Sequence, residues 1–366
     1  MGNRWDINIA YKGKGVVRFL NEYYKNRDKS ILYILGKGFD PRMNNGIEIY
    51  ADNVNCETLD CLLVDFPSVS ESQYQKLIKN NYVKLKSKLE EKRYELIEDV
   101  IKADFSKDYN KALKEVCRQL NKFDCQNYTD IIIDISSLPR SIYFNLIKTI
   151  YKKYPNNEKN ILVFVSENVE MDRLIQETNL SDMEPIFGFR GNYNKSNILK
   201  GINISIPIIG EGKTETLKKI LDGFDAEDVC PVLPFPSQDL RRSENLLYEY
   251  CEVFKDRLML EHQDFAYVDE KNPFELYTII NNIIDNYQES LKPLGGELGF
   301  GISILASKLL SLGALFVALD DNRRGKITIF NVKANDYTIN IDDETFIDKN
   351  INSESHLVWV TGDAYK

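Results

Sequence analysis

Two short segments combine glycine, hydroxyl and basic residues in a pattern that suits anion binding. They are GKGFDPR at residues 36–42 and DISSLPR at residues 134–140. Glycine lets the backbone approach a ligand closely, and lysine or arginine neutralises phosphate or carboxylate charge. The two serines of the second segment precede an expected helix start, where backbone N–H groups also favour an anion. The ligand-binding residues predicted in this half of the chain are Lys37, Asp40, Arg42, Asp134, Ser136, Ser137 and Arg140.

Both segments also have a purely structural interpretation. Asp40 could close a strand-exit turn by contacting Arg42 or the backbone. Asp134 stands in a run of isoleucines, where a carboxylate is costly without a partner, and it could pair with Arg140. Arg140 is expected in the first turn of a helix, where a cation opposes the helix dipole. That placement favours a facing carboxylate or phosphate, so the structural and ligand interpretations both stay open.

A third segment, GEGKTET at residues 210–216, resembles a degenerate phosphate loop. It supplies the Gly-Lys-Thr end of the P-loop pattern GxxxxGK[ST], but the position of the first glycine is occupied by Pro207. We therefore expect anion binding at the helix N-terminus rather than nucleotide hydrolysis by a true P-loop. A serine and a lysine stand at another expected helix start in this half. The ligand-binding residues predicted here are Lys213, Thr214, Ser307 and Lys308.

Other residue types with chemical potential are sparse. Arg241 and Arg242 could grip a phosphate, but we favour a solvated pair balanced by neighbouring acidic residues. The two histidines, His262 and His356, stand far apart with no cysteine or histidine at metal-ligand spacing. We expect no metal site and no cofactor. A Ser-His-Asp triad is disfavoured too, because the chain has no GxSxG segment.

Composition limits the class of protein. The chain has 47 basic and 56 acidic residues, a formal net charge of −9, so no extended nucleic-acid surface is expected. No apolar stretch approaches the roughly 18–20 residues of a membrane span, and the first residues do not resemble a signal peptide. Six cysteines without paired spacing indicate reduced thiols. We expect a cytoplasmic protein without membrane contact.

Apolar runs rich in β-branched residues alternate with amphipathic segments. The expected strands are 31–36, 61–66, 130–135, 161–166, 204–210, 229–235, 265–270 and 298–303. The expected helices are 71–103, 107–122, 140–153, 213–222, 240–256, 273–289 and 307–319. Continuous apolar runs indicate strands buried on both faces, and the alternation indicates doubly wound βαβ units. The predicted fold class is α/β, with two Rossmann-like, mostly parallel sheets.

The division of the chain follows from its composition. A Gly- and Asn-rich segment at residues 188–201 suggests a boundary between domains at 1–195 and 196–366. Residues 326–332 and 336–342 flank a short Ala-Asn loop, which predicts a C-terminal β-hairpin, and a last strand at 356–362 could pair with it. Each half opens with a strand that runs into a Gly-x-Gly loop. Internal duplication and chance similarity both remain compatible with this likeness.

With these residues in view, the chain resembles the Rossmann-like sensor domains of bacterial antiviral systems, the CARF and SAVED group. The resemblance rests on residues 36–42, residues 134–140 and the Ser307-Lys308 helix start. It implies two Rossmann-like halves whose strand-end loops hold a cyclic or linear oligonucleotide second messenger. No appended nuclease signature is evident, so any effector activity would have to come from a protein partner in a defence complex. The segment DISSLPR departs from the group, since it lacks the glycine pair usual in the second loop.

The leading prediction is a sensor or accessory subunit of a bacterial defence system that binds a nucleotide-like or other phosphorylated small molecule. The first alternative is a hydrolase or transferase acting on a nucleotide, with Asp40 or Asp134 as base and Arg140 as electrostatic clamp. The second alternative is a non-catalytic structural interaction subunit whose polar loops only cap helices.

Overall fold

The computed structural model describes residues 4–25, 29–67, 74–191, 193, 201–295, 297–320 and 327–366. The chain forms two compact units, here named unit A (residues 9–176 and 336–366) and unit B (residues 1–8 and 177–335). These bounds differ from the expected division at residue 195. They differ because the end of the chain adds a strand to the first sheet, while the beginning of the chain packs in unit B.

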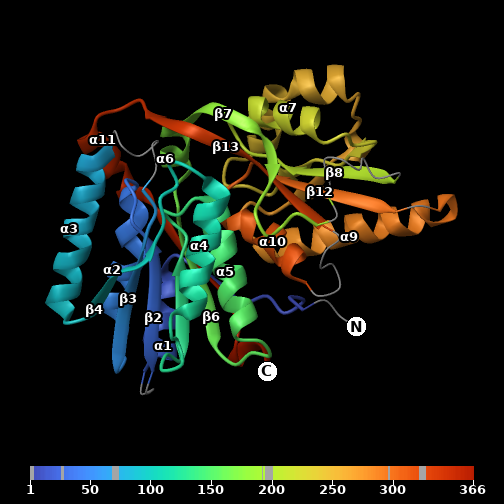
Figure 1. Ribbon diagram of the computed structural model, residues 1–366. Helices are drawn as coiled ribbons and strands as arrows, with labels where there is room; N and C mark the ends of the chain where they lie inside the picture. Colours follow the sequence, from blue (N-terminus) through green and yellow to red (C-terminus); the bar gives the residue numbers. More distant parts are fainter. Residues whose placement is uncertain are drawn as a thin grey trace. The chain divides into compact units, whose positions relative to one another are not determined.

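The sheet of unit A has the strand order β1-β14-β6-β5-β2-β3-β4 (Figure 1). Its strands are β1 (Ala10–Lys12), β2 (Ser30–Gly36), β3 (Thr58–Asp65), β4 (Glu95–Lys102), β5 (Asp130–Asp134), β6 (Asn160–Glu167) and β14 (Glu354–Thr361). Strands β2 to β6 are parallel, while β14 is antiparallel to both β6 and β1. The predicted parallel sheet of residues 31–36, 61–66, 130–135 and 161–165 is confirmed.

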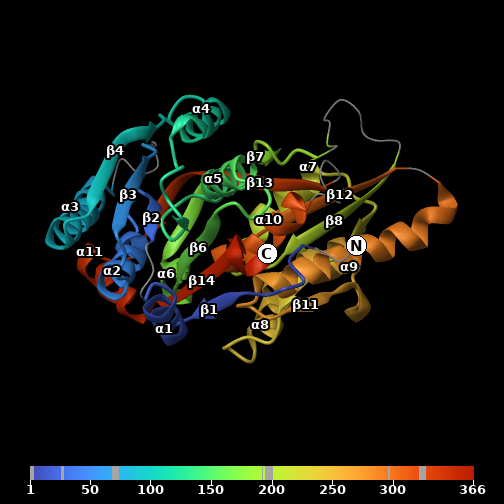
Figure 2. The ribbon, with the colours of Figure 1, turned by 90° about the horizontal axis from the view of Figure 1, so that it is seen from below.

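Helices cover both faces of this sheet, because its central strands are apolar on both faces. The helices are α1 (Lys14–Tyr23), α2 (Asn45–Asn53), α3 (Gln75–Lys92), α4 (Tyr109–Lys122), α5 (Arg140–Lys153), α6 (Val169–Leu174) and α11 (Asp343–Asp348). Alternate residues of β2, such as Tyr33 and Leu35, pack with α1, α2 and α3 in one core. Figure 2 shows α4 and α5 on the opposite side of the sheet from α1 and α2.

The sheet of unit B has the order β11-β10-β8-β12-β13-β7, with the short β9 also paired to β8. Its strands are β7 (Ile175–Pro185), β8 (Ile202–Ile208), β9 (Asp228–Val229), β10 (Val232–Pro234), β11 (Ala266–Val268), β12 (Leu298–Ile304) and β13 (Ile327–Ile339). Its helices are α7 (Thr214–Gly223), α8 (Arg242–Glu249), α9 (Pro273–Leu291) and α10 (Lys308–Leu319). Strands β11, β10, β8, β12 and β13 are parallel, so a second mostly parallel sheet is present as predicted.

The two units share one strand order. In unit A, β3 and β4 follow β2 on one side and β5 and β6 lie on the other. In unit B, β10 and β11 follow β8 on one side and β12 and β13 lie on the other. In each sheet, the chain therefore adds strands first on one side and then on the other. The change of side falls between β2 and β5 in unit A and between β8 and β12 in unit B. An internal duplication would produce this arrangement.

The structure corrects several expected elements. Residues 71–103 contain α3 and then the edge strand β4, and the helical pattern hid this strand because most of its residues are exposed. Instead of a terminal hairpin, β13 is one continuous strand, since Ala334-Asn335 lacks the glycine that tight hairpin turns favour. Strand β14 pairs with β1 and β6.

The free edge of β4 is partly closed by a side chain of α4. Gln119 Oε1 accepts a hydrogen bond from Lys102 N at 2.9 Å, and its Nε2 donates to the Lys102 carbonyl at 3.1 Å. Asp99 within the same strand has a positive φ of 57°, which interrupts regular strand geometry. Both features disfavour pairing of β4 with another strand.

The two tryptophans lie in different units. Trp5 is completely buried in unit B, where its ring stacks on Phe316 at 4.7 Å and meets Tyr277 edge-on at 5.5 Å. Trp359 lies on β14 in unit A and packs edge-on against Tyr23 of α1 at 5.2 Å. The segment before β1 is thus part of the core of unit B. Among the described residues, no helix has the length and apolar character needed to cross a bilayer.

The cysteines give a first testable prediction. Burial, together with nearby aspartates, raises the pKa of Cys56 and of Cys230 to about 11, so both are neutral thiols at pH 8. Cys251 is exposed. Because the thiolate is the nucleophile, we expect a disulfide reagent at pH 8 to modify Cys251 well before Cys56. The Cys56 rate should rise about tenfold per pH unit below its pKa. Peptide mapping after timed labelling measures this, and equal rates at pH 8 would contradict it.

Candidate functional site

The predicted residues of unit A gather where strands β2 and β5 end. These strands are adjacent and parallel, and the chain changes from one side of the sheet to the other between them. The segments 37–40 and 135–139 therefore leave the sheet at the same edge. Ligands of open α/β sheets bind outside the carboxyl ends of the strands at such a reversal point. The topology thus brings together the two segments that the sequence singled out.

The two segments pack directly on each other. The Ser137 hydroxyl donates a hydrogen bond to the Gly36 carbonyl at 2.9 Å. A Cβ added to Gly36 would lie 2.3 Å from the Leu138 side chain, so only glycine fits here. The Ser136 hydroxyl accepts from the backbone N–H of Ser166 at 2.9 Å and so joins this loop to the end of β6. Both serines hold the loops in place.

Asp134 is buried at the end of β5, with only 1% of its surface exposed. The Tyr33 hydroxyl donates to its Oδ2 at 2.6 Å, and the backbone N–H of Ser136 donates to its Oδ1 at 2.9 Å. Burial, reinforced by the Asp134 charge, raises the pKa of Tyr33 well above its ordinary value, which keeps the phenol as the donor. The carboxylate that looked costly in the sequence is therefore satisfied by hydrogen bonds.

Arg42 forms a buried ion cluster with two aspartates. Its guanidinium contacts Asp40 at 2.6 Å and Asp172 of α6 at 2.8 Å. Burial alone would lower the pKa of Arg42, but the Asp172 and Asp40 carboxylates raise it overall. Asp40 also accepts from the Arg42 backbone N–H at 3.0 Å and caps the 3-10 turn Pro41–Asn44. With 3% of Arg42 exposed, this geometry corresponds to the structural interpretation of the segment, the closed strand-exit turn.

Lys37 and Arg140 are the predicted cations of unit A that remain partly exposed. The Lys37 ammonium lies 3.9 Å from Asp65, at the end of β3, and 5.2 Å from the centre of the Tyr82 ring on α3. Arg140 is the first residue of α5, preceded by Pro139, which offers no side-chain cap. One cation thus comes from each of the two segments.

The corresponding point of unit B lies between β8 and β12. A Cβ on Gly210 would lie 2.5 Å from the Leu305 carbonyl oxygen, so the two strand exits nearly touch. Lys213 forms an ion pair with Glu177 at 2.6 Å, and the Gly212 N–H donates to Glu249 at 2.7 Å. Thr214 begins α7. Ser307 caps α10 by accepting from Leu310 N at 3.3 Å, and Lys308 is the first residue of that helix.

Arg242 forms ion pairs with residues that follow two strands of unit B, β8 and β11. It pairs with Glu211 at 2.8 Å and with Glu270 at 2.6 Å, and its side chain is only 11% exposed. Burial would lower the pKa of Arg242, but these two carboxylates raise it overall. The expected solvated pair is therefore wrong for Arg242. Its partners follow β8 and β11, which are distant in sequence.

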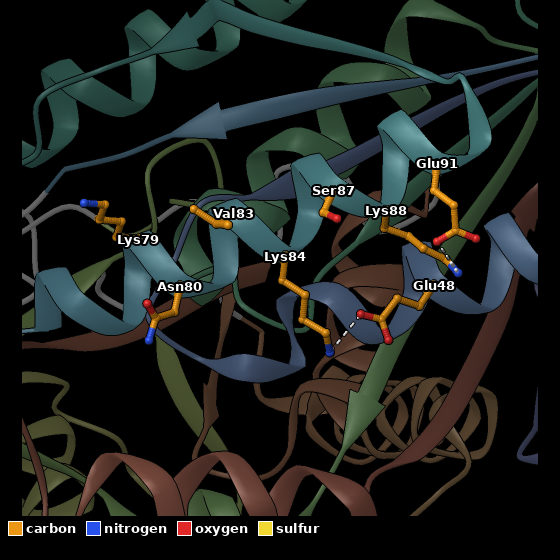
Figure 3. Close-up of a pocket in the computed structure, with 8 residues that line it drawn as sticks. All are labelled: Glu48, Lys79, Asn80, Val83, Lys84, Ser87, Lys88 and Glu91. Carbon is orange, nitrogen blue, oxygen red and sulfur yellow. Dashed lines mark ion pairs between the residues drawn. The ribbon is translucent and has the colours of Figure 1, made fainter.

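An open groove of about 650 Å³ lies elsewhere in unit A, between α2 and α3 (Figure 3). Its lining residues are Glu48, Lys79, Asn80, Val83, Lys84, Ser87, Lys88 and Glu91. Lys84 pairs with Glu48 at 2.9 Å and Lys88 lies 3.8 Å from Glu91, so opposite charges in the groove face one another. It contains none of the predicted site residues, and we assign no ligand to it.

Several side chains that shape the site were missed by the sequence analysis. Asp65 was detectable, because it lies near the end of the expected strand 61–66, at the same edge of the sheet as Lys37. Asp172 and Tyr82 belong to helices distant in sequence, and no local spacing connects them with Arg42 or Lys37. Tyr33 lies inside an apolar run, and its hydroxyl was the one local sign that a buried hydrogen-bond acceptor lies nearby. In the described part of the chain, no three His, Cys, Asp or Glu side chains are grouped to hold a metal ion.

No protein-family model matches the chain, and no curated protein matches it in sequence. Solved structures give distant likenesses. A type III CRISPR defence DNA nuclease activated by cyclic oligoadenylate matches at 8% identity over 78% of this chain and 63% of its own, with a TM-score of 0.44. The glycopeptide N-methyltransferase MtfA matches at 9% identity over 49% of this chain and 63% of its own, with a TM-score of 0.23.

A precorrin-6y C5,15-methyltransferase from Geobacter metallireducens matches at 12% identity over 49% of this chain and 79% of its own, also with a TM-score of 0.23. The chain spans less than two-thirds of the length of the nuclease and of the N-methyltransferase. At these TM-scores the likenesses assign neither a family nor a function. The chain's own two sheets establish its fold class, a doubly wound, mostly parallel α/β fold.

Proposed function

We propose that the protein binds a phosphorylated, nucleotide-like ligand at the carboxyl ends of β2 and β5. The observation that carries this proposal is the position of Lys37 and Arg140. Lys37 follows β2 and Arg140 is the first residue of α5, and the two loops at these positions pack together through Gly36, Ser137 and Leu138, at the reversal point of the sheet. Two cations on loops that contact each other directly can hold phosphate oxygens.

The contrast with unit B favours unit A as the site. In unit B, the cations Lys213 and Arg242 form ion pairs of 2.6–2.8 Å, and Glu249 accepts the Gly212 N–H. A phosphate would have to displace these carboxylates. In unit A, the Lys37–Asp65 distance is 3.9 Å, and Asp65 is shared with Lys102 at 3.4 Å. Lys37 therefore has the weaker internal partner.

The role we propose for this binding is that of a sensor or accessory subunit of a bacterial defence system, acting with a protein partner. This finer proposal rests on the resemblance of the strand-end segments to the CARF and SAVED group. We do not propose the hydrolase or transferase alternative. Its candidate bases, Asp40 and Asp134, are buried and engaged with Arg42 and Tyr33, respectively.

The test compares charge removal in the two units. ATP and a cyclic oligoadenylate serve as probes in calorimetric titrations, and native mass spectrometry looks for a co-purifying nucleotide. We expect Arg140→Ala and Lys37→Ala each to weaken probe binding about 10- to 150-fold, the effect of losing one charged hydrogen bond. The matched control, Lys213→Ala, should bind as the wild type does.

Melting temperatures of the same variants separate binding from stability. An Arg140→Ala variant that melts early but binds normally would make the 134–140 segment a structural turn and refute its part in the site. A wild-type protein that binds neither probe and carries no nucleotide would refute the proposal as a whole.

A further inference from the structure

Helix α3 buries a polar residue in the middle of its apolar face. Within this helix, all of which the structure describes, Asn81 is the one polar side chain among the buried residues. The others are Leu77, Ile78, Leu85 and Leu89, spaced as one face of a helix. Asn81 has 5% of its surface exposed. Burying an amide costs free energy unless hydrogen bonds replace those lost to water, so Asn81 requires partners inside the fold.

The partners of Asn81 belong to the loop that carries Lys37. Asn81 Nδ2 donates to two successive carbonyls of this loop, that of Gly38 at 3.0 Å and that of Phe39 at 2.9 Å. The backbone carbonyl of Asn81 accepts from Asn44 Nδ2 at 3.0 Å. Asn44 lies in the 3-10 turn that ends the same loop. The middle of α3 is therefore joined to the segment that follows β2.

This loop has two sets of anchors, one on each side of Lys37. Towards β2, the Lys37 N–H donates to the Val64 carbonyl at 2.9 Å, and the Ser137 hydroxyl donates to the Gly36 carbonyl. On the other side, Asn81 supplies both bonds to the loop carbonyls. Glycine flanks Lys37 on either side, and glycine restricts the backbone least. A loop that is held before a ligand arrives loses less freedom on binding.

We propose that Asn81 is a positioning residue of the ligand site, which fixes the loop 37–40 and thereby the place of Lys37. This inference rests on the proposed function, because phosphate binding by Lys37 is itself a proposal. Asn81 does not touch the ligand and acts through the loop. An apolar side chain at position 81 would continue the apolar face of α3 but would donate no hydrogen bond to the loop. The effect of Asn81 on binding is therefore separable from its packing.

Hydrogen exchange on the full chain without ligand tests the positioning itself. Asn81→Ala removes both donors, so we expect the amides of residues 37–40 to exchange about tenfold faster or more, the effect of losing two neutral hydrogen bonds. If Asn81→Ala does not fold, Asn81→Ser makes a milder change, since its hydroxyl is shorter than the carboxamide. Unchanged exchange of residues 37–40 in the folded variant would overturn the proposal.

The matched control is Asn160→Ala in the same unit. Asn160 is also buried, but it begins β6, at the opposite end of the sheet from the candidate site. Its Nδ2 donates to the Asp363 carboxylate at 3.1 Å. We expect this variant to leave both the exchange of residues 37–40 and probe binding unchanged. Equal effects of Asn160→Ala and Asn81→Ala on the loop would overturn the proposal.

A double-mutant cycle tests the link to the ligand, with ATP and a cyclic oligoadenylate as probes. We expect Asn81→Ala to weaken probe binding about tenfold, both alone and combined with Arg140→Ala. Combined with Lys37→Ala, it should change binding less than about twofold, because no lysine is left to position. A purely structural role would lower the melting temperature and leave the affinity of the folded protein intact.

The outcomes separate this proposal from the proposed function. An equal loss of binding with and without Lys37, or normal binding by folded Asn81→Ala, would overturn the role of Asn81 while the site itself stands. A wild type that binds neither probe refutes the proposed function and, with it, any effect of Asn81 on affinity. In that case the exchange of residues 37–40 alone decides whether Asn81 holds the loop.

Discussion

Replacing Trp5 with alanine is expected to lower the free energy of unfolding of unit B by about 3–5 kcal/mol. The indole is completely buried between α9 and α10, against Tyr277 and Phe316, so its loss leaves a cavity among rigid rings. For a unit of this size, the loss corresponds to a melting temperature roughly 6–20 °C lower. The residue lies more than 170 positions before the rest of unit B in sequence, yet it belongs to that core.

Scanning calorimetry and hydrogen exchange measure this effect unit by unit. In the Trp5→Ala variant, Trp359 remains as the only tryptophan and reports on unit A by fluorescence. Unit B peptides should exchange faster, and Trp5→Phe should restore most of the stability because an aromatic ring is kept. Unchanged exchange in α9 and α10 after Trp5→Ala would mean that the segment before β1 does not pack there.

Arg42→Met should destabilise unit A by about 3–5 kcal/mol, since it leaves the buried Asp40 carboxylate without its cation. Asp172 also loses its contact with Arg42, which ties α6 to the end of β2. If Arg42 were a ligand-binding residue, the same change would weaken probe binding and leave stability intact. Chemical denaturation monitored through Trp359, in a Trp5→Phe background, separates the two outcomes.

The matched control is Arg18→Met on α1 of the same unit. Arg18 forms an exposed ion pair with Glu22, and exposed pairs contribute little to stability. A second control, Asp40→Asn combined with Arg42→Met, should recover part of the lost stability because it removes the unpaired charge. Equal destabilisation by Arg18→Met and Arg42→Met would contradict the structural role of the buried cluster.

The sequence predicts the parts of this fold whose signal is local. Central strands such as β2 and β5 are continuous apolar runs, and their type and parallel pairing could be inferred. Strand β4 could not be inferred from the sequence, because an exposed edge strand mixes charged and apolar residues much as a surface helix does. The partner of β14 could not be inferred either, since the pairing joins residues nearly 200 positions apart.

The candidate site likewise has features that the sequence predicts and features that it does not. The convergence of segments 36–42 and 134–140 follows from strand order, and glycine, serine and arginine mark it locally. The burial of Arg42 and Arg242 could not be predicted from the sequence. Their partners Asp172, Glu211 and Glu270 come from other elements of the fold. From the sequence alone, a cation in a loop can be interpreted as available to bind a ligand. The folded chain can place a carboxylate from another element against that cation.

The position of β14 has a consequence for how the protein is made. Among the described residues, this strand lies between β6 and β1 and is the one strand that pairs with β1, and the ribosome adds it after all of unit B. Domains commonly fold during synthesis, beginning with the segments made first. Here β2 to β6 can assemble early, whereas β1 must wait as an unpaired strand. The emerging chain therefore carries an unfinished first sheet while the second one forms.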